Sequence, residues 1–161
     1  MTKKHPSEDF PLEDWNQIIQ VNLTGVFLFA QKAGKVMLDQ GQGSIINISS
    51  VASKQAITSS IAYGASKGGV NMLTKTFASE WANRGVRVNG IAPAYIETPL
   101  VKAIKDHRED FSNDILKRTP MNRMGEPREI VGAVIFLASD ASSYVTGETI
   151  FVDGGWTSIG L

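Results

Sequence analysis

The sequence predicts an α/β fold built around a small parallel sheet. Three short runs of β-branched and apolar residues, each of strand length, are separated by long segments whose apolar residues recur at helical spacing. The runs are apolar at almost every position, which is typical of parallel strands covered on both faces. With 161 residues, of which 42% are hydrophobic, the chain has the length of one domain and enough apolar side chains for a core.

The first predicted element is a long helix over residues 15–39. It follows a lead-in over residues 1–12 that we expect to be exposed, since Pro6 and Pro11 disfavour regular structure. The helix is indicated by apolar residues at helical spacing, which are Trp15, Ile18, Ile19, Leu23, Val26, Phe27, Ala30, Ala33 and Met37.

The next predicted elements are a buried strand over residues 44–49, a serine-rich loop, and a helix over residues 62–83. A run of isoleucines indicates the strand, and Gly85 is placed to end the helix. In open α/β sheets, ligands bind at the carboxyl ends of the strands. We therefore expect the loop that follows this strand to carry functional residues.

The rest of the chain continues the alternation of strands and helices. The predicted elements are a strand over residues 86–92, a loop over 93–98, a charged segment over 100–124 with one or two short helices, a helix over 126–139 and a strand over 149–152. His107 lies in the charged segment, where we expect a solvated histidine rather than a catalytic one.

The composition excludes several classes of function. Sixteen basic and sixteen acidic residues leave no net charge, so we expect no nucleic-acid partner and no anionic membrane partner. The chain has no cysteine, which excludes disulfides and thiolate metal sites and fits a reducing compartment. No segment resembles a signal peptide or a membrane span. We expect a cytoplasmic protein that holds no metal.

Three polar residues follow the central strand at a distinctive spacing. Ser50 is followed thirteen residues later by Tyr63, and Tyr63 is followed four residues later by Lys67. Tyr63 and Lys67 therefore lie one turn apart on the same face of the predicted helix. The plainer alternative is that Tyr63 packs in the core, Lys67 is its solvated neighbour and Ser50 forms a turn.

This pattern resembles the active site of the short-chain dehydrogenase/reductase family, and three flanking segments resemble the same family. DWNQIIQVNLTGVFLFAQ matches the family's segment around a catalytic asparagine, which falls on Asn22. PAYIET matches its loop beside the cofactor, with Ala94 where glycine is usual, and FLASDASSYVTGETIFVDGG matches its C-terminal signature. The four motifs agree in order and spacing and cover nearly the whole chain.

The resemblance implies a catalytic set of Asn22, Ser50, Tyr63 and Lys67. In the family, the tyrosine exchanges a proton with the substrate oxygen, and the charge of the lysine favours the phenolate. The same lysine holds the nicotinamide ribose, the serine donates to the substrate oxygen, and the asparagine holds a water of a proton relay. The implied cofactor contacts are Tyr63, Lys67, Pro93, Ala94, Ile96 and Thr98. In an ordinary strand-to-helix loop, Thr98 would simply cap the helix.

The family's cofactor-binding turn, Gly-x-x-x-Gly-x-Gly, is missing from this sequence. The resemblance therefore assigns residues 1–161 to one incomplete α/β domain, the second part of a doubly wound parallel-sheet Rossmann fold lacking the N-terminal nucleotide-binding strands. Without a neighbouring strand, residues 44–49 would form an apolar sheet edge. We expect NAD or NADP to bind only if the missing part is supplied, and the isolated chain to be inactive.

The resemblance implies an oxidoreductase that transfers hydride between the nicotinamide and a carbonyl or secondary alcohol of a small molecule. The C-terminal segments look most like gluconate 5-dehydrogenases and related sugar-acid dehydrogenases, although acyl-carrier ketoreductases share most of these residues. Residues 100–125 would form a lid over the substrate. The alternative is a catalytically silent interaction fragment that binds no cofactor.

The resemblance also implies a homo-oligomer, a dimer or tetramer, assembled through the helices over residues 15–39 and 62–83. Leu28 and Phe29 lie beside the apolar stripe of the first helix. A helix with one buried face needs only the stripe, so these residues indicate a second contact. The alternative is that further chain belonging to the same fold covers them.

Overall fold

The computed structural model of the chain describes residues 1–99, 101 and 109–158. The expected lid over residues 100–125 is therefore described only in part, and His107 lies outside the described residues. In its described part, the charged segment contains α5 (Glu109–Arg118), where one or two short helices were predicted.

A parallel sheet of three strands forms the centre of the described structure. In spatial order the strands are β1 (Gly43–Ile48), β2 (Val86–Pro93) and β3 (Thr149–Val152). Gly43 pairs with Val86 at the start of the first ladder, and Gly90 pairs with Thr149 at the start of the second. The three predicted strands and their parallel arrangement are confirmed.

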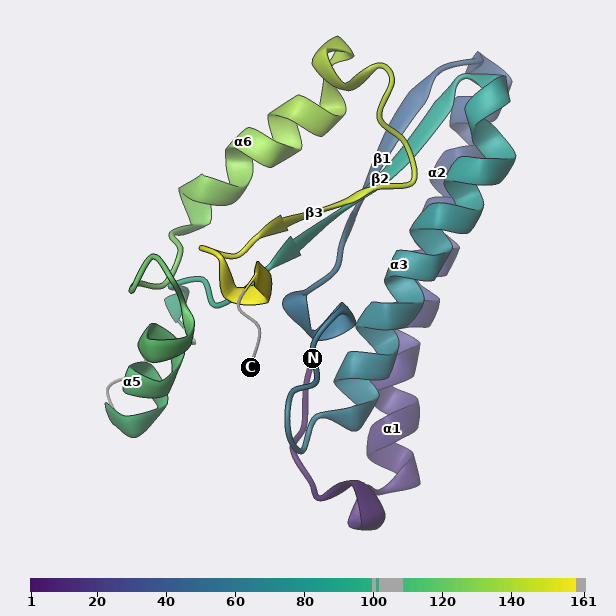
Figure 1. Cartoon of the computed structure of the whole chain (residues 1–161). Coiled ribbons are helices and arrows are strands. Elements are labelled where there is room, and N and C mark those ends of the chain that lie inside the picture. The colour runs from purple at the N-terminus through teal and green to yellow at the C-terminus, as the bar shows by residue number, and fades with distance from the viewer. Residues whose placement is uncertain (100, 102–108, 159–161) are drawn as a thin grey trace.

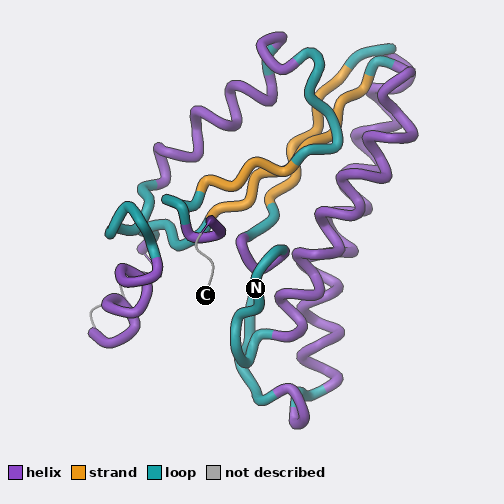
Figure 2. The backbone as a smooth tube through the Cα atoms, in the orientation of Figure 1, coloured by secondary structure: helices purple, strands orange, loops and turns teal. Residues whose placement is uncertain are grey.

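Helices lie on both faces of this sheet, as Figures 1 and 2 show. One face is covered by the helices α2 (Gly25–Gln40) and α3 (Ile61–Trp81), and the other by α6 (Pro127–Ala138). The helix α1 (Leu12–Ile19) packs on α3 beyond the ends of the strands. The parallel strands are thus covered by helices, which explains why they read as apolar runs.

The first predicted helix differs from expectation in two ways. It begins at Leu12 and ends at Gln40, and a π-helical turn over Gln20–Thr24 interrupts it. The lead-in is largely exposed, as expected, but it contains a 3₁₀ turn over Ser7–Asp9. It is also tied to the fold, because the His5 N–H donates to the Ser59 carbonyl over 3.1 Å.

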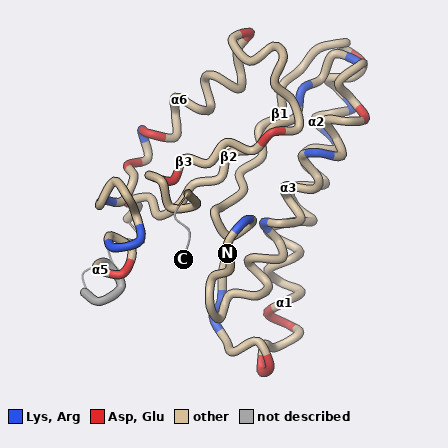
Figure 3. The backbone as a smooth tube through the Cα atoms, in the orientation of Figure 1, with Lys and Arg blue, Asp and Glu red and all other residues tan. Residues whose placement is uncertain are grey.

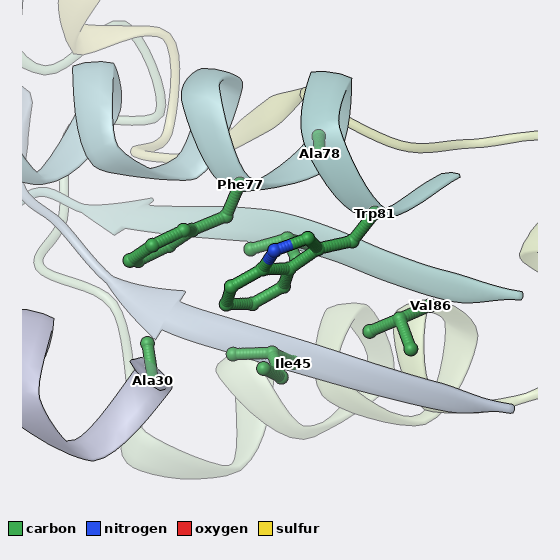
Figure 4. Packing of buried hydrophobic residues seen from close by; sticks show 7 residues of the cluster. Ala30, Ile45, Phe77, Ala78, Trp81 and Val86 are labelled. Carbon is green, nitrogen blue, oxygen red and sulfur yellow. The ribbon is translucent and has the colours of Figure 1, made fainter. Parts of the chain in front are cut away.

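The main hydrophobic cluster fixes α3 along the sheet (Figure 4). The rings of Phe77 and Trp81 stack with centroids 4.3 Å apart and pack on Ile45 of β1 and Val86 of β2. A Cβ on Gly34 of α2 would lie 2.5 Å from the Trp81 ring, so only glycine lets α2 approach this closely. This packing at the C-terminal end of α3 fixes the position of its N-terminal end beside the carboxyl ends of the strands.

The surface of the described residues carries charges of both signs, and β1 and β3 form the two edges of the sheet. Charged residues of both signs are spread along the described chain in Figure 3, although α1 carries only acidic ones, Glu13 and Asp14. Among the described residues, β1 pairs only with β2, and Ile48 at its end is 49% exposed, as the expected apolar edge requires. No described helix combines the length and apolar character needed to cross a bilayer.

Candidate functional site

The chain leaves the sheet at the end of β1 through Ser49 and Ser50 and enters the 3₁₀ turn η3 (Val51–Ser53). Ser50 is buried, and its Oγ accepts a hydrogen bond from the Ala52 N–H over 3.2 Å. Since that bond uses only a lone pair, the hydroxyl hydrogen of Ser50 remains available for a ligand.

Tyr63 and Lys67 lie on α3 beside this strand end. The Lys67 Nζ donates to the Ile48 carbonyl over 2.8 Å and lies 5.9 Å from the centre of the Tyr63 ring. The Ser49 Oγ donates back to the Lys67 carbonyl over 3.3 Å. The structure therefore places Tyr63 and Lys67 at the carboxyl end of β1, where the loop carrying Ser50 begins.

Burial changes the electrostatics of Lys67. Its pKa is lowered, because loss of water around the side chain penalises the charged form. A bound group that carries negative charge would restore the preference for the ammonium form. The lysine is thus suited to respond to an anionic or phenolate neighbour.

Asn22 lies in the π-helical turn and faces α3. Its Oδ1 accepts from the Met1 amino group over 3.2 Å, and its Nδ2 donates to the Met1 carbonyl over 2.8 Å and to the Ser66 Oγ over 3.4 Å. Backbone groups and Ser66 therefore satisfy this buried amide. π-Helical turns occur often at functional sites, and the relay water proposed for Asn22 remains a prediction.

The loop after β2 presents unpaired backbone groups at Ile96. Gly125 donates its N–H to the Tyr95 carbonyl over 3.0 Å and accepts from the Glu97 N–H over 2.8 Å. In a parallel bridge of this kind, the N–H and C=O of Ile96 point away from Gly125. Neither group has a hydrogen-bond partner within the described ranges. The Ile96 N–H can donate to the oxygen of a primary carboxamide, and the Ile96 C=O can accept from its NH₂ group.

The other predicted loop residues shape this turn. Pro93 ends β2, and the Ala94 N–H donates to the Val152 carbonyl over 3.3 Å. The Thr98 Oγ1 accepts from the Val101 N–H over 3.3 Å, as in a helix cap. In the part of the chain that the structure describes, no three His, Asp or Glu side chains gather to hold a metal ion.

An ion pair anchors the segment that carries Gly125. Arg123 donates two hydrogen bonds to the Glu129 carboxylate, of 2.6 and 2.7 Å, and the Glu126 N–H donates to the same carboxylate over 2.7 Å. These bonds lower the pKa of Glu129 to about 2, chiefly through Arg123. The sequence analysis did not predict this anchor. Its signal is the Glu-Pro-x-Glu pattern at the start of α6, in which Glu126 and Glu129 form a capping box.

The sequence reading also missed an aromatic cluster beside the site. Trp156 is 7% exposed, and its ring lies 5.1 Å from that of Tyr95, centroid to centroid. Both pack with Val51, which directly follows Ser50. Burial raises the pKa of the Tyr95 phenol. The sequence signals were Tyr95, which lies inside the PAYIET loop, and Trp156, which directly follows the Gly154–Gly155 pair.

Known proteins resemble the chain over almost all of its length. Residues 1–157 match the family profile described as Enoyl-(Acyl carrier protein) reductase. A 2-dehydro-3-deoxy-D-gluconate 5-dehydrogenase of Bacillus subtilis is 49% identical over 96% of this chain and 61% of its own length. A 5-keto-D-gluconate 5-reductase of Escherichia coli K12 is 43% identical over 95% of this chain and 60% of its own.

A solved structure has the same fold. The gluconate 5-dehydrogenase from Burkholderia cenocepacia, crystallised with NADP and tartrate, superposes with a TM-score of 0.95 at 46% identity. The match covers 99% of this chain and 62% of that protein. The chain thus spans about three fifths of the length of these relatives.

The lowered pKa of Lys67 gives a direct test of its environment. In the folded protein the ammonium should lose its proton below pH 10.5, the ordinary value for lysine, because burial disfavours the charge. An NMR titration of the lysine Nζ groups would measure this, with Lys67→Met identifying the resonance. A midpoint at or above the ordinary value would contradict the placement of Lys67 against the end of β1.

Proposed function

The chain belongs to the short-chain dehydrogenase/reductase family, and we propose that it forms the catalytic part of an NAD(P)-dependent oxidoreductase of sugar acids. The supporting observation is the hydrogen bond of Lys67 to the Ile48 carbonyl, one helical turn from Tyr63 and at the strand end that leads to Ser50. The relatives named for gluconate derivatives support the sugar-acid substrate.

The residues present suit the nicotinamide end of NAD or NADP. The N–H and C=O of Ile96, which have no partner among the described residues, match the carboxamide, and the Lys67 ammonium suits the ribose hydroxyls. The cofactor, when bound, supplies or accepts the hydride. The chain contains no glycine-rich turn for the pyrophosphate, so we propose that binding requires the segment that the longer relatives carry.

The proposed chemistry uses the chain's own side chains for proton transfer. During reduction, hydride adds to the carbonyl carbon, the π electrons move to the oxygen, and that oxygen takes the proton of the Tyr63 hydroxyl. During oxidation, the Tyr63 phenolate takes the hydroxyl proton as hydride leaves the carbinol carbon. The Lys67 charge favours the phenolate. Ser50 donates its free hydroxyl hydrogen to the substrate oxygen, where charge develops.

Asn22 and Ile115 lie near these catalytic groups and are proposed to support them. Asn22 holds Ser66, the neighbour of Lys67 on α3, and so positions the helix that carries the proton-transfer groups. In the lid proposed for residues 100–125, Ile115 of α5 belongs to the same hydrophobic cluster as Val51, which follows Ser50. This shared cluster supports a position of α5 over the substrate.

Replacing Tyr63 tests the function. The assay uses a hybrid in which the N-terminal segment of the Bacillus subtilis relative precedes this chain, with NADPH and 5-keto-D-gluconate. Tyr63→Phe should lower kcat at least about a hundredfold, because positioned proton transfer contributes that much or more. Tyr144→Phe, at a fully exposed position, should leave it unchanged. A Tyr63→Phe variant that keeps more than about a tenth of kcat would refute the assignment.

A second candidate is an interaction fragment without catalysis. The missing glycine-rich turn favours it, as does the apolar surface of α2 and α3, where Phe29 is 81% exposed and Met72 also lies open. Turnover in the hybrid separates the two candidates. Under either one, we propose that the protein forms a homo-oligomer through the helices over residues 15–39 and 62–83.

The assembly proposal predicts the effect of a charge on α2. Phe29→Glu should shift the protein from a dimer or larger species toward monomer or insolubility, because it buries a carboxylate in an apolar contact. Gln40→Glu, at an exposed position of the same helix, is the matched control. Sedimentation velocity at micromolar concentration measures both. A wild-type monomer, or equal behaviour of the two variants, would show that α2 is not an interface.

A further inference from the structure

An arginine stacks on the aromatic cluster beside the proposed active site. Arg118 ends α5, and its guanidinium carbon lies 4.8 Å from the centre of the Trp156 ring. Trp156 opens the short helix η6 (Trp156–Ser158), which lies between α5 and the ends of the strands in Figure 1. The indole is buried, while the arginine side chain is exposed on top of it.

Close packing on either side holds this pair together. The Met121 N–H donates to the Gly154 carbonyl over 3.1 Å. A Cβ on Gly154 would lie 2.9 Å from Thr119, and one on Gly155 would lie 2.8 Å from Pro120. The segment that follows Arg118 therefore lies directly against the glycine turn that precedes Trp156. Arg118 is positioned by this contact and does not depend on the stacking alone.

The aromatic cluster beneath Arg118 adjoins the loop of Ser50. Val51, directly after Ser50, packs in the same cluster as Trp156 and Tyr95. The pKa of Tyr95 is raised chiefly by burial, and both the Arg118 charge and the Tyr63 phenol act on it. Tyr95 therefore lies within electrostatic reach of both Arg118 and Tyr63.

The positive charge of Arg118 is not neutralised in the described part of the chain, where it forms no ion pair. The neighbouring charged groups are Lys54, Arg123 and Asp153. The Lys54 Nζ lies 5.2 Å from the centre of the Phe151 ring. Arg123 pairs with Glu129, and the Asp153 carboxylate accepts from the Gly155 and Thr157 N–H groups, at 2.9 Å each. A guanidinium stacked on an indole keeps its N–H edge free for a carboxylate.

We propose that Arg118 binds the carboxylate of the substrate and thereby sets the specificity of the site for keto and hydroxy acids over neutral sugars. This inference rests on the proposed function, since it concerns the same active site. Tyr95 and Trp156 offer apolar ring surface to the C–H groups of the sugar chain. The reacting carbon then lies toward Tyr63 and the carboxylate toward α5.

Two substrates that differ in one group test the proposal. 5-Keto-D-gluconate and L-sorbose share the reacting ketone, but L-sorbose has a hydroxymethyl group in place of the carboxylate. In the hybrid enzyme, Arg118→Gln should lower kcat/KM for the keto acid at least about tenfold, as expected for a lost charged hydrogen bond. The kcat/KM for L-sorbose should stay within about twofold of its value in the unsubstituted hybrid. Arg118→Lys should give a kcat/KM for the keto acid between those of the unsubstituted hybrid and Arg118→Gln. Arg128→Gln, at an exposed arginine of α6, should change neither.

A binding measurement covers the case in which turnover is too slow to compare. With NADP present, D-gluconate should shift the Trp156 indole N–H resonance, and D-glucitol, its neutral counterpart, should not. Arg118→Gln should abolish the gluconate shift. Equal shifts by the two ligands, or an equal loss of kcat/KM for the two substrates, would overturn the role of Arg118. These results leave the proposed function standing, because that function depends on the Tyr63→Phe result.

Discussion

The hydrogen bond from the Lys67 ammonium to the Ile48 carbonyl is the contact on which the candidate site depends. It joins α3 to the end of β1 over 2.8 Å, at the point where the chain turns into the loop of Ser50. It also fixes the ammonium one turn from Tyr63, so the charge that favours a phenolate is held by the sheet itself. Without this bond, a carbonyl at the strand end would lose its partner and the lysine would turn to solvent.

The rest of the fold keeps that contact in place. At the far end of α3, Trp81 packs against Gly34 and fixes the helix along β1 and β2. Near the site, Asn22 ties the π-helical turn to Ser66, the neighbour of Lys67. Gly125, held by the anchored start of α6, orients the backbone of Ile96. Two of these contacts therefore lie near the site, and the third fixes α3 from its far end.

The sequence predicts the regular elements well because each carries its own local signal. The isoleucine run of β1 and the apolar spacing of α3 depend on neighbours close in sequence, and both elements appear within a residue or two of their predicted bounds. The spacing of Tyr63 and Lys67 also suffices to place them on one helix face. The π-helical turn was not predictable, because the apolar stripe runs through it without interruption.

Features built by contacts distant in sequence could not be predicted. The partners of Asn22 include Met1, which the sequence marks only as part of a loose lead-in. The Arg118–Trp156 stack joins α5 to the turn after β3, and neither residue carries a periodic signal. The bridge of Ile96 to Gly125 likewise depends on how the loop after β2 meets the start of α6.

The proposed function is hydride transfer between a nicotinamide and the carbonyl of a sugar acid. The most direct measurement supplies the hybrid with 5-keto-D-gluconate and with NADPH that carries deuterium at both positions of the nicotinamide C4, and locates the isotope in the product by NMR. We expect gluconate with deuterium on C5 and with only solvent-derived hydrogen on the new hydroxyl. Gluconate that carries protium at C5, or the absence of any reduced product, would contradict the claim.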